Sequence, residues 1–149
     1  MVVASPRQLE EAVTRQPTSW AVRSYESAAA FERLMEDPAV FEGHVARVVE
    51  IAAQEGVTAI AGVSPIGDRV AMAVSSRSAL RVGDSPDTGT LLLVDGFVNT
   101  GIQLALAIRR ANEKGSARAV GLGLVAQEQA VTQWRAAGLE LVAVETVVV

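Results

Sequence analysis

A short apolar run, Leu91-Leu92-Leu93-Val94, ends in a single acid, Asp95, and constrains the fold of this chain more than any other feature. Leucine and valine without polar alternation are typical of a strand that is buried on both faces, as in a parallel sheet. The acid then emerges at the carboxyl end of the strand, which is where open α/β sheets bind their ligands. The sequence therefore predicts a parallel sheet with a candidate site at the end of this strand.

Strand and helix patterns alternate from Gly56 to the end of the chain. The expected strands cover 57–63, 80–83, 91–95, 117–125 and 139–147, and the expected helices cover 67–79, 102–114 and 129–137. Such alternation predicts a three-layer α/β fold, in which a parallel sheet carries helices on both faces through right-handed crossovers. We expect a single domain over 1–149, with an N-terminal helical lead-in (1–55) before the α/β core (56–149).

The lead-in carries two helix starts. Ser5 followed by Pro6 predicts a short helix over 5–15, and Asp37-Pro38 predicts a second helix that ends at Gly56. Residues 25–35 fit either a helix or an irregular segment. His44 lies one position off the apolar stripe of the second helix, so we expect a surface or partly buried side chain and not a catalyst.

Composition excludes several classes of function. The chain has no Cys and one His, which excludes a disulfide framework, a zinc site and a Cys-His catalytic couple. Its net charge of −4 argues against binding of nucleic acid. No apolar run approaches the roughly 20 residues that span a bilayer, and Gln, Glu and Arg interrupt any signal-peptide pattern. We therefore expect a cytoplasmic protein without a metal site of its own and without a nucleic-acid or membrane partner.

The polar residues after the strand, Asn99-Thr100-Gly101-Ile102-Gln103, open a predicted helix. Unpaired amides and the helix dipole make such an N-terminus attractive to anions. Thr100 and Gly101 are the strongest candidates for a phosphate contact, because glycine permits close backbone approach and threonine adds a hydroxyl. An ordinary capped turn explains the same residues, and Asp95 could serve as a cap or bind loop amides.

The stretch from Leu91 to Gln103 resembles the phosphoribosyl pyrophosphate motif of the type I phosphoribosyltransferases. In that motif an apolar strand runs into two adjacent acids, then apolar residues, then a Thr-Thr-Gly-x-Thr-like loop. The resemblance implies that Asp95 is the first acid, which holds ribose hydroxyls directly or through a magnesium-bound substrate. It also implies that the loop residues wrap the 5-phosphate, namely Asn99, Thr100, Gly101, Ile102 and Gln103. Gly96 stands where the family has its second acid.

A second match lies upstream. The strand at 57–63 and the following Ser64-Pro65-Ile66-Gly67 look like the first core strand and pyrophosphate loop of the orotate phosphoribosyltransferases in particular. The resemblance makes Ser64, Pro65 and Gly67 candidates for pyrophosphate contact, although they could also form a simple tight turn. Asp68 opposes the first reading, since a carboxylate repels phosphate oxygens unless magnesium bridges them. We therefore expect Mg²⁺ only together with a pyrophosphate-containing ligand.

Two further departures from the orotate enzymes bear on the chemistry. Those enzymes have a long mobile loop rich in Lys, Arg and His, whereas residues 81–90 here hold one cation and two acids. They also have an Asp-Arg pair, with its Arg beside the orotate, where this chain has Gln127-Glu128-Gln129. Transfer passes through a cationic ribosyl state while pyrophosphate leaves, so the enzyme must neutralise the departing charge. This sequence offers few groups for that task.

The sequence thus predicts a phosphoribosyltransferase-like glycosyltransferase homologue of nucleotide metabolism. We expect it to bind phosphate and ribose 5-phosphate, as in a nucleotide or phosphoribosyl pyrophosphate, with weak or lost transferase activity. One alternative is an active transferase on an unidentified base, with cations from Arg69, Arg77, Arg81 or a neighbouring subunit. Another is a regulatory or interaction subunit without a small ligand. The apolar end at 142–149 predicts either burial in the sheet or a homodimer, which the resembled family often forms.

Overall fold

The computed structural model describes residues 20–83, 89–115 and 118–148, with side chains from residue 28 onward. The short helix expected over 5–15 lies outside these residues. The described helices are α2 (Trp20–Met35), α3 (Pro38–Gln54), α4 (Pro65–Ser76), α5 (Ile102–Glu113) and α6 (Glu128–Ala136). The described strands are β1 (Ala59–Gly62), β2 (Arg81–Val82), β3 (Thr90–Val98), β4 (Arg118–Gln127) and β5 (Leu141–Val147).

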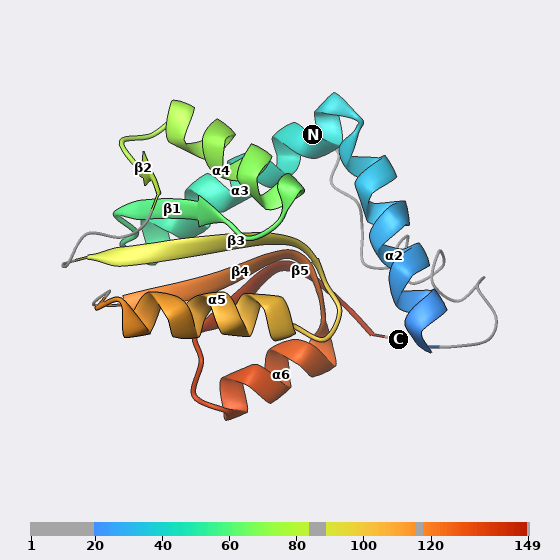
Figure 1. Cartoon of the computed structure of the whole chain (residues 1–149). Helices are drawn as coiled ribbons and strands as arrows, with labels where there is room; N and C mark the ends of the chain where they lie inside the picture. The colour runs from blue at the N-terminus through green and yellow to red at the C-terminus, as the bar shows by residue number, and fades with distance from the viewer. Residues whose placement is uncertain (1–19, 84–88, 116–117, 149) are drawn as a thin grey trace.

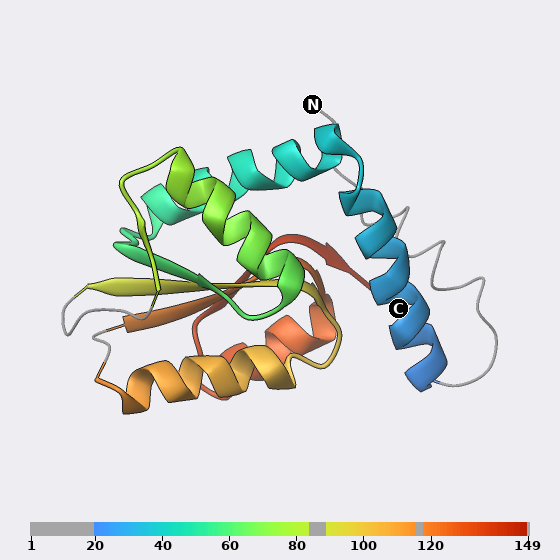
Figure 2. The ribbon, with the colours of Figure 1, turned by 45° about the horizontal axis from the view of Figure 1, so that its top comes forward.

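All five strands run parallel in one sheet with the order β2-β1-β3-β4-β5. In Figure 1, α3 and α4 cover one face of the sheet, while α5 and α6 cover the other. The first helix, α2, lies beyond the carboxyl ends of the strands and beside α3 (Figure 2). This arrangement confirms the predicted three-layer α/β fold with helices on both faces.

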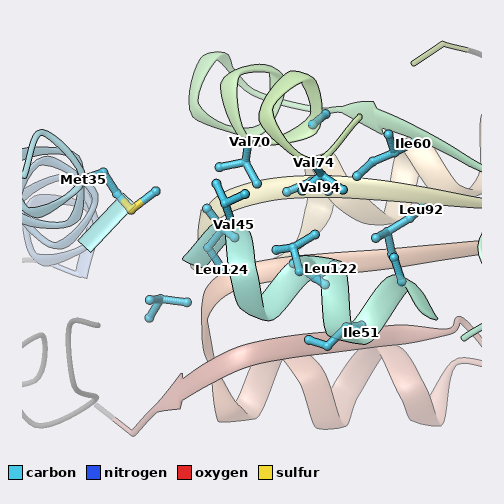
Figure 3. Packing of buried hydrophobic residues seen from close by; sticks show 14 of the residues in the cluster. Met35, Val45, Ile51, Ile60, Val70, Val74, Leu92, Val94, Leu122 and Leu124 are labelled. Carbon is cyan, nitrogen blue, oxygen red and sulfur yellow. The ribbon is translucent and has the colours of Figure 1, made fainter. Parts of the chain in front are cut away.

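The apolar run in β3 is buried on both sides, as its composition predicts. Leu92 and Val94 pack in the cluster beneath α3 and α4, while Leu91 and Leu93 pack in the cluster beneath α5. Figure 3 shows the first cluster, where side chains of both helices meet those of the strands, among them Val45, Ile51, Val70, Val74, Ile60, Leu122 and Leu124. The central strand is therefore the layer on which both halves of the core are built.

Some helix and strand boundaries agree with the expected ones and others differ. Asp37 caps α3 as predicted, since its carboxylate accepts the N–H of Ala39 at 2.8 Å. The first strand starts later than expected, because the N–H of Val57 donates to Ala52 at the end of α3 instead of joining the ladder. The segment at 25–35 is helical and belongs to α2. β5 forms the far edge of the sheet, with the side chains of Leu141 and Val147 buried.

His44 differs from the expectation of a surface or partly buried side chain. It is fully buried, because α2 packs over α3 at this point and the ring of Phe31 stands edge-on to the imidazole, with centroids 5.8 Å apart. The Nδ1 atom lies 3.0 Å from the carbonyl oxygen of Val40, while Nε2 is buried without a hydrogen-bond partner. Burial lowers the pKa of His44, so the imidazole is neutral. Within the described part of the chain, no helix combines the length and apolarity needed to cross a membrane.

Candidate functional site

β3 runs on to Val98, past the end at Asp95 that the sequence predicts, because Asp95, Phe97 and Val98 still pair with β4. Asp95 lies one residue beyond the last pair that β3 forms with β1, Gly62 with Val94. The side chain is only 8% exposed, and its Oδ1 accepts the N–H of Gly96 at 2.8 Å. The hydroxyl of Ser64, which follows β1, also hydrogen-bonds to this carboxylate. Burial raises the pKa of Asp95, and the hydrogen bonds from Gly96 and Ser64 partly oppose the rise. The acid is therefore held in one position by both strands.

The loop after β3 is tied down by residues from β4 and α6. Gln127, the last residue of β4, donates its amide N–H to the side-chain oxygen of Asn99 at 2.5 Å. The indole N–H of Trp134, on α6, donates to the backbone carbonyl of Thr100 at 2.7 Å. The side chain of Thr100 stays exposed. These two hydrogen bonds fix the loop on the side that faces β4 and α6, and they leave the Thr100 side chain exposed.

Gly101 turns the chain into α5. Its φ of 79° lies in the left-handed region that favours glycine, and the space where a Cβ would stand is taken by the Trp134 ring. No side chain caps α5, and the hydroxyl of Thr100 makes only a long contact of 3.4 Å with the N–H of Ile102. Ile102 and Gln103 are exposed. An uncapped helix start with exposed first-turn residues is a suitable binding site for a phosphate group.

The start of α4 is different, because a side chain caps it. The hydroxyl oxygen of Ser64 accepts the N–H of Gly67 at 3.1 Å, and Pro65 has no N–H to offer. Asp68 adds a carboxylate to the same first turn. Ser64 hydrogen-bonds to Asp95 and Gly67 packs against the backbone of Val94, so this turn lies beside β3. The contact of Ser64, Pro65 and Gly67 with pyrophosphate stays a prediction.

Gly96 stands where the type I phosphoribosyltransferase motif has its second acid, and other side chains pack closely around it. A Cβ at this position would lie 3.3 Å from Cε1 of Phe31 and 3.6 Å from Cβ of Ile66. Phe31 comes from α2, is fully buried, and also packs against Phe97 with ring centroids 6.4 Å apart. A carboxylate at position 96 would have to displace these side chains. The sequence pointed to Gly96 but not to its contact with Phe31, which lies in a segment that fitted either a helix or an irregular structure.

Two adjoining hollows flank the loop on the side of α6. The smaller one, of about 370 Å³, is lined by Asn99, Thr100, Gln127, Gln129, Ala130 and Gln133. The other, of about 460 Å³, shares Gln127, Gln129 and Gln133 and extends to Val147 at the end of β5. Their polar lining consists mainly of amides and hydroxyls and includes one acid, Glu128, and no cation. Gln127, Glu128 and Gln129, which stand where the orotate enzymes have their Asp-Arg pair, thus lie along these hollows.

The carboxylates of the site do not form a metal-binding cluster. Among the described residues, no group of three or more His, Asp and Glu side chains could hold a metal ion. Asp95 brings one carboxylate, which already accepts two hydrogen bonds. Mg²⁺ commonly takes one or two carboxylates together with substrate phosphates. Asp95 therefore fits magnesium only when a ligand supplies most of the oxygens.

Comparisons of the sequence with protein-family models and with curated proteins give no match. Comparison of the structure with solved structures gives many matches, and phosphoribosyltransferases are among them. The orotate phosphoribosyltransferase of Aeropyrum pernix matches with a TM-score of 0.66 at 24% identity, over 77% of this chain and 75% of that one. The UMP synthase of Leishmania donovani matches with a TM-score of 0.66 at 19% identity, over 76% of this chain but only 28% of its own.

Adenine enzymes have the same architecture. The adenine phosphoribosyltransferase of Trypanosoma brucei, solved with AMP, pyrophosphate and ribose-5-phosphate, matches with a TM-score of 0.62 at 13% identity. That match covers 76% of this chain and 67% of the other. The chain therefore has the type I phosphoribosyltransferase fold, which confirms the predicted resemblance. At these identities the likeness establishes the fold and leaves the chemistry to be argued from the site.

Proposed function

We propose that this protein binds a ligand that carries a ribose 5-phosphate group, such as a nucleotide or phosphoribosyl pyrophosphate, and has weak or lost transferase activity. The observation that carries the proposal is the open, anchored loop at 99–101. Gln127 and Trp134 hold the loop through hydrogen bonds to Asn99 and Thr100, while α5 begins after Gly101 without a side-chain cap. The amides of the first turn and the hydroxyl of Thr100 would hold the phosphate.

Asp95 would contact the ribose. It lies buried in the same strand that leads into the loop, and the hydrogen bonds from Gly96 and Ser64 fix its orientation. A ligand whose phosphate sits on α5 would extend its sugar towards this carboxylate. Mg²⁺ would enter only with a pyrophosphate-containing ligand, since Asp95 alone offers too few oxygens.

Three features support weak or lost transfer. Phe31 and Ile66 occupy the space beside Gly96, so a second acid has no room there. The N–H of Gly67 donates to the hydroxyl oxygen of Ser64, and that hydroxyl also bonds the Asp95 carboxylate. Asp68 adds negative charge where pyrophosphate would leave. The hollows beside the loop contain no cation among their lining residues. An active site for this chemistry needs positive charge or metal ions at the leaving group.

The experiment combines calorimetry with thermal unfolding. Ribose 5-phosphate, AMP, UMP and phosphoribosyl pyrophosphate with Mg²⁺ are titrated into the protein, and saturable heat with a raised Tm is expected for at least one of them. Thr100→Asp should abolish binding without loss of stability, because an acid at a helix start favours the helix but repels phosphate. Ala39→Asp places the same carboxylate in the first turn of α3 and should leave binding intact.

The same protein is assayed for nucleotide formation from phosphoribosyl pyrophosphate, Mg²⁺ and a panel of bases. Little or no product is expected. Efficient product formation that is lost in Asp95→Ala would instead establish an active transferase. Absence of any binding would favour a regulatory or interaction subunit without a small ligand. The homodimer and the cytoplasmic location predicted from the sequence are part of the same proposal.

A further inference from the structure

Strand β1 has a helix packed over only one of its faces in the described part of the chain. α4 packs on β1 from one side of the sheet, while α5 and α6 lie on the other side (Figure 2). On that other side, α5 packs against β3 and β4, and α6 packs against β4 and β5. Strands of a parallel sheet are normally covered on both faces. Ala61 and Val63 belong to the apolar cluster on the α5 side and stay partly exposed.

A groove of about 570 Å³ lies along α5 beside this uncovered strand. The volume is within the range of about 300 to 1,000 Å³ that is usual for small-molecule sites. The wall that α5 forms extends from Gln103 to Lys114, which is about 16 Å at the helical rise of 1.5 Å per residue. Most of the lining is apolar and comes from β1, β3 and α5, including Ala61, Val63, Leu91, Leu93, Leu106 and Ala107.

The groove ends in positive charge. Arg110 and Lys114 line it at the end of α5, and their spacing of four residues places them on the same side of the helix. The lining residues include these two cations and no acid. The guanidinium of Arg110 is exposed and forms no hydrogen bond or ion pair with the described residues. A guanidinium presents a planar set of donors that matches a carboxylate. An apolar groove with this end is complementary to a ligand with an apolar body and one anionic head group.

We propose that this groove binds a linear aliphatic carboxylate, at a second site that the ribose 5-phosphate ligand does not occupy. The carboxylate pairs with Arg110 and Lys114. The acyl chain lies along Leu93, Leu106 and Ala107 and points towards Gln103, the last residue of the candidate phosphate loop. Because each buried methylene adds hydrophobic free energy, the affinity increases with chain length until the chain fills the groove.

Calorimetry with hexanoate, octanoate and decanoate, each below its micelle-forming concentration, tests the proposal. One molecule should bind per chain, and the affinity should rise about threefold for each added methylene. Decanol, which has the chain without the charge, should bind at least tenfold more weakly than decanoate. Ala107→Phe fills the groove and should abolish binding of decanoate, whereas Ala136→Phe, on the exposed end of α6, should leave it intact.

Two arginines of α5 provide the matched pair of variants for the charge. Arg110→Met keeps the apolar stem but removes the guanidinium, and it should weaken binding of decanoate at least fivefold. Arg109→Met removes an exposed arginine that does not line the groove, and the affinity should stay at the wild-type value. Circular dichroism should show the wild-type fold in both variants.

Several outcomes would overturn the proposal. Equal affinities for decanoate and decanol, or equal losses in Arg109→Met and Arg110→Met, would show that the cations do not select the ligand. Binding to phosphatidylglycerol vesicles without saturable binding of decanoate would show a membrane surface instead. Absence of both kinds of binding would show that the groove holds no such ligand. Ribose 5-phosphate is titrated in parallel and should bind wild-type protein and Arg110→Met alike, so this proposal and the proposed function can fail separately.

Discussion

Trp134 donates its indole N–H to the carbonyl oxygen of Thr100 across 2.7 Å, and so joins α6 to the loop that opens α5. The contact spans 34 residues of sequence and fixes the backbone at the point where a phosphate would bind. Replacing Trp134 by Phe keeps an aromatic ring beside Gly101 but removes the donor. Because a hydrogen bond contributes about 1 kcal/mol, ligand affinity should fall roughly fivefold.

Calorimetry with the ligand that binds the wild-type protein measures this change. The Tm without ligand should fall only slightly, since most of the ring contacts are kept. An unchanged Kd in Trp134→Phe would show that the anchored loop does not contribute to binding.

Gly96→Asp should destabilise the fold and should not restore a second ribose-binding acid. The new carboxylate would be forced against Phe31 and Ile66, and overpacking combined with a buried charge should cost about 3 kcal/mol or more. Gly96→Ala adds only the Cβ and should cost about 1 kcal/mol. Chemical denaturation measures both values.

Phe31→Ala in the Gly96→Asp background is the companion variant. Removal of the ring opens space for the carboxylate, so the double mutant should be more stable than the sum of the two single changes predicts. Strict additivity would show that Phe31 is not what closes this side of the site.

The buried His44 and the partly buried Glu145 should make the stability of the fold depend on pH in opposite directions. The pKa of His44 is lowered by burial, so the unfolded chain binds the proton more readily, and stability should fall as the pH drops below about 6.5. Burial raises the pKa of Glu145 to about 7, so the folded protein keeps its proton longer than the unfolded chain. The stabilisation that protonated Glu145 gives is present at low pH and is lost as the pH rises from about 4.5 towards 7.

Denaturation of His44→Leu and Glu145→Gln between pH 4.5 and 7.5 separates the two effects. Relative to the wild-type protein, the free energy of unfolding of His44→Leu should be higher at the acid end of the range than at the neutral end. That of Glu145→Gln should be higher at the neutral end than at the acid end. Parallel curves for all three proteins would contradict the buried, unpaired positions of the His44 Nε2 and Glu145 Oε2 atoms.

Arg118 should matter more to stability than an ordinary surface arginine. Its guanidinium bonds both carboxylate oxygens of Glu140 and the carboxylate and carbonyl of Glu55, which joins the starts of β4 and β5 to the end of α3. Arg118→Met should cost about 1 to 2 kcal/mol because several charge-assisted bonds are lost together. Arg47→Met breaks a single exposed pair with Glu50 and should change stability by less than about 0.5 kcal/mol.

Local patterns in the sequence were sufficient for most of the sheet. The run from Leu91 to Val94 predicted a strand buried on both faces, and Asp37-Pro38 predicted the start of α3, because both signals depend on near neighbours in the chain. The resemblance in 91–103 predicted the type I phosphoribosyltransferase fold.

Contacts across the fold could not be predicted in the same way. Periodicity shows that a side chain such as Phe31 or His44 tends towards burial, but it does not show what covers it, and His44 proved fully buried only because α2 packs there. Trp134 gave no sequence signal that it would hold Thr100, and the two-residue strand β2 depends on pairing with β1 more than on its own pattern.

The most direct test of the account is an NMR titration of the backbone amides with ribose 5-phosphate. The account predicts saturable shifts at Thr100, Gly101, Ile102 and Gln103, with much smaller changes at Gly67, whose N–H is already bonded to Ser64. Shifts concentrated at α4, or no saturable shift at 100–103 under conditions in which the protein is folded, would contradict it.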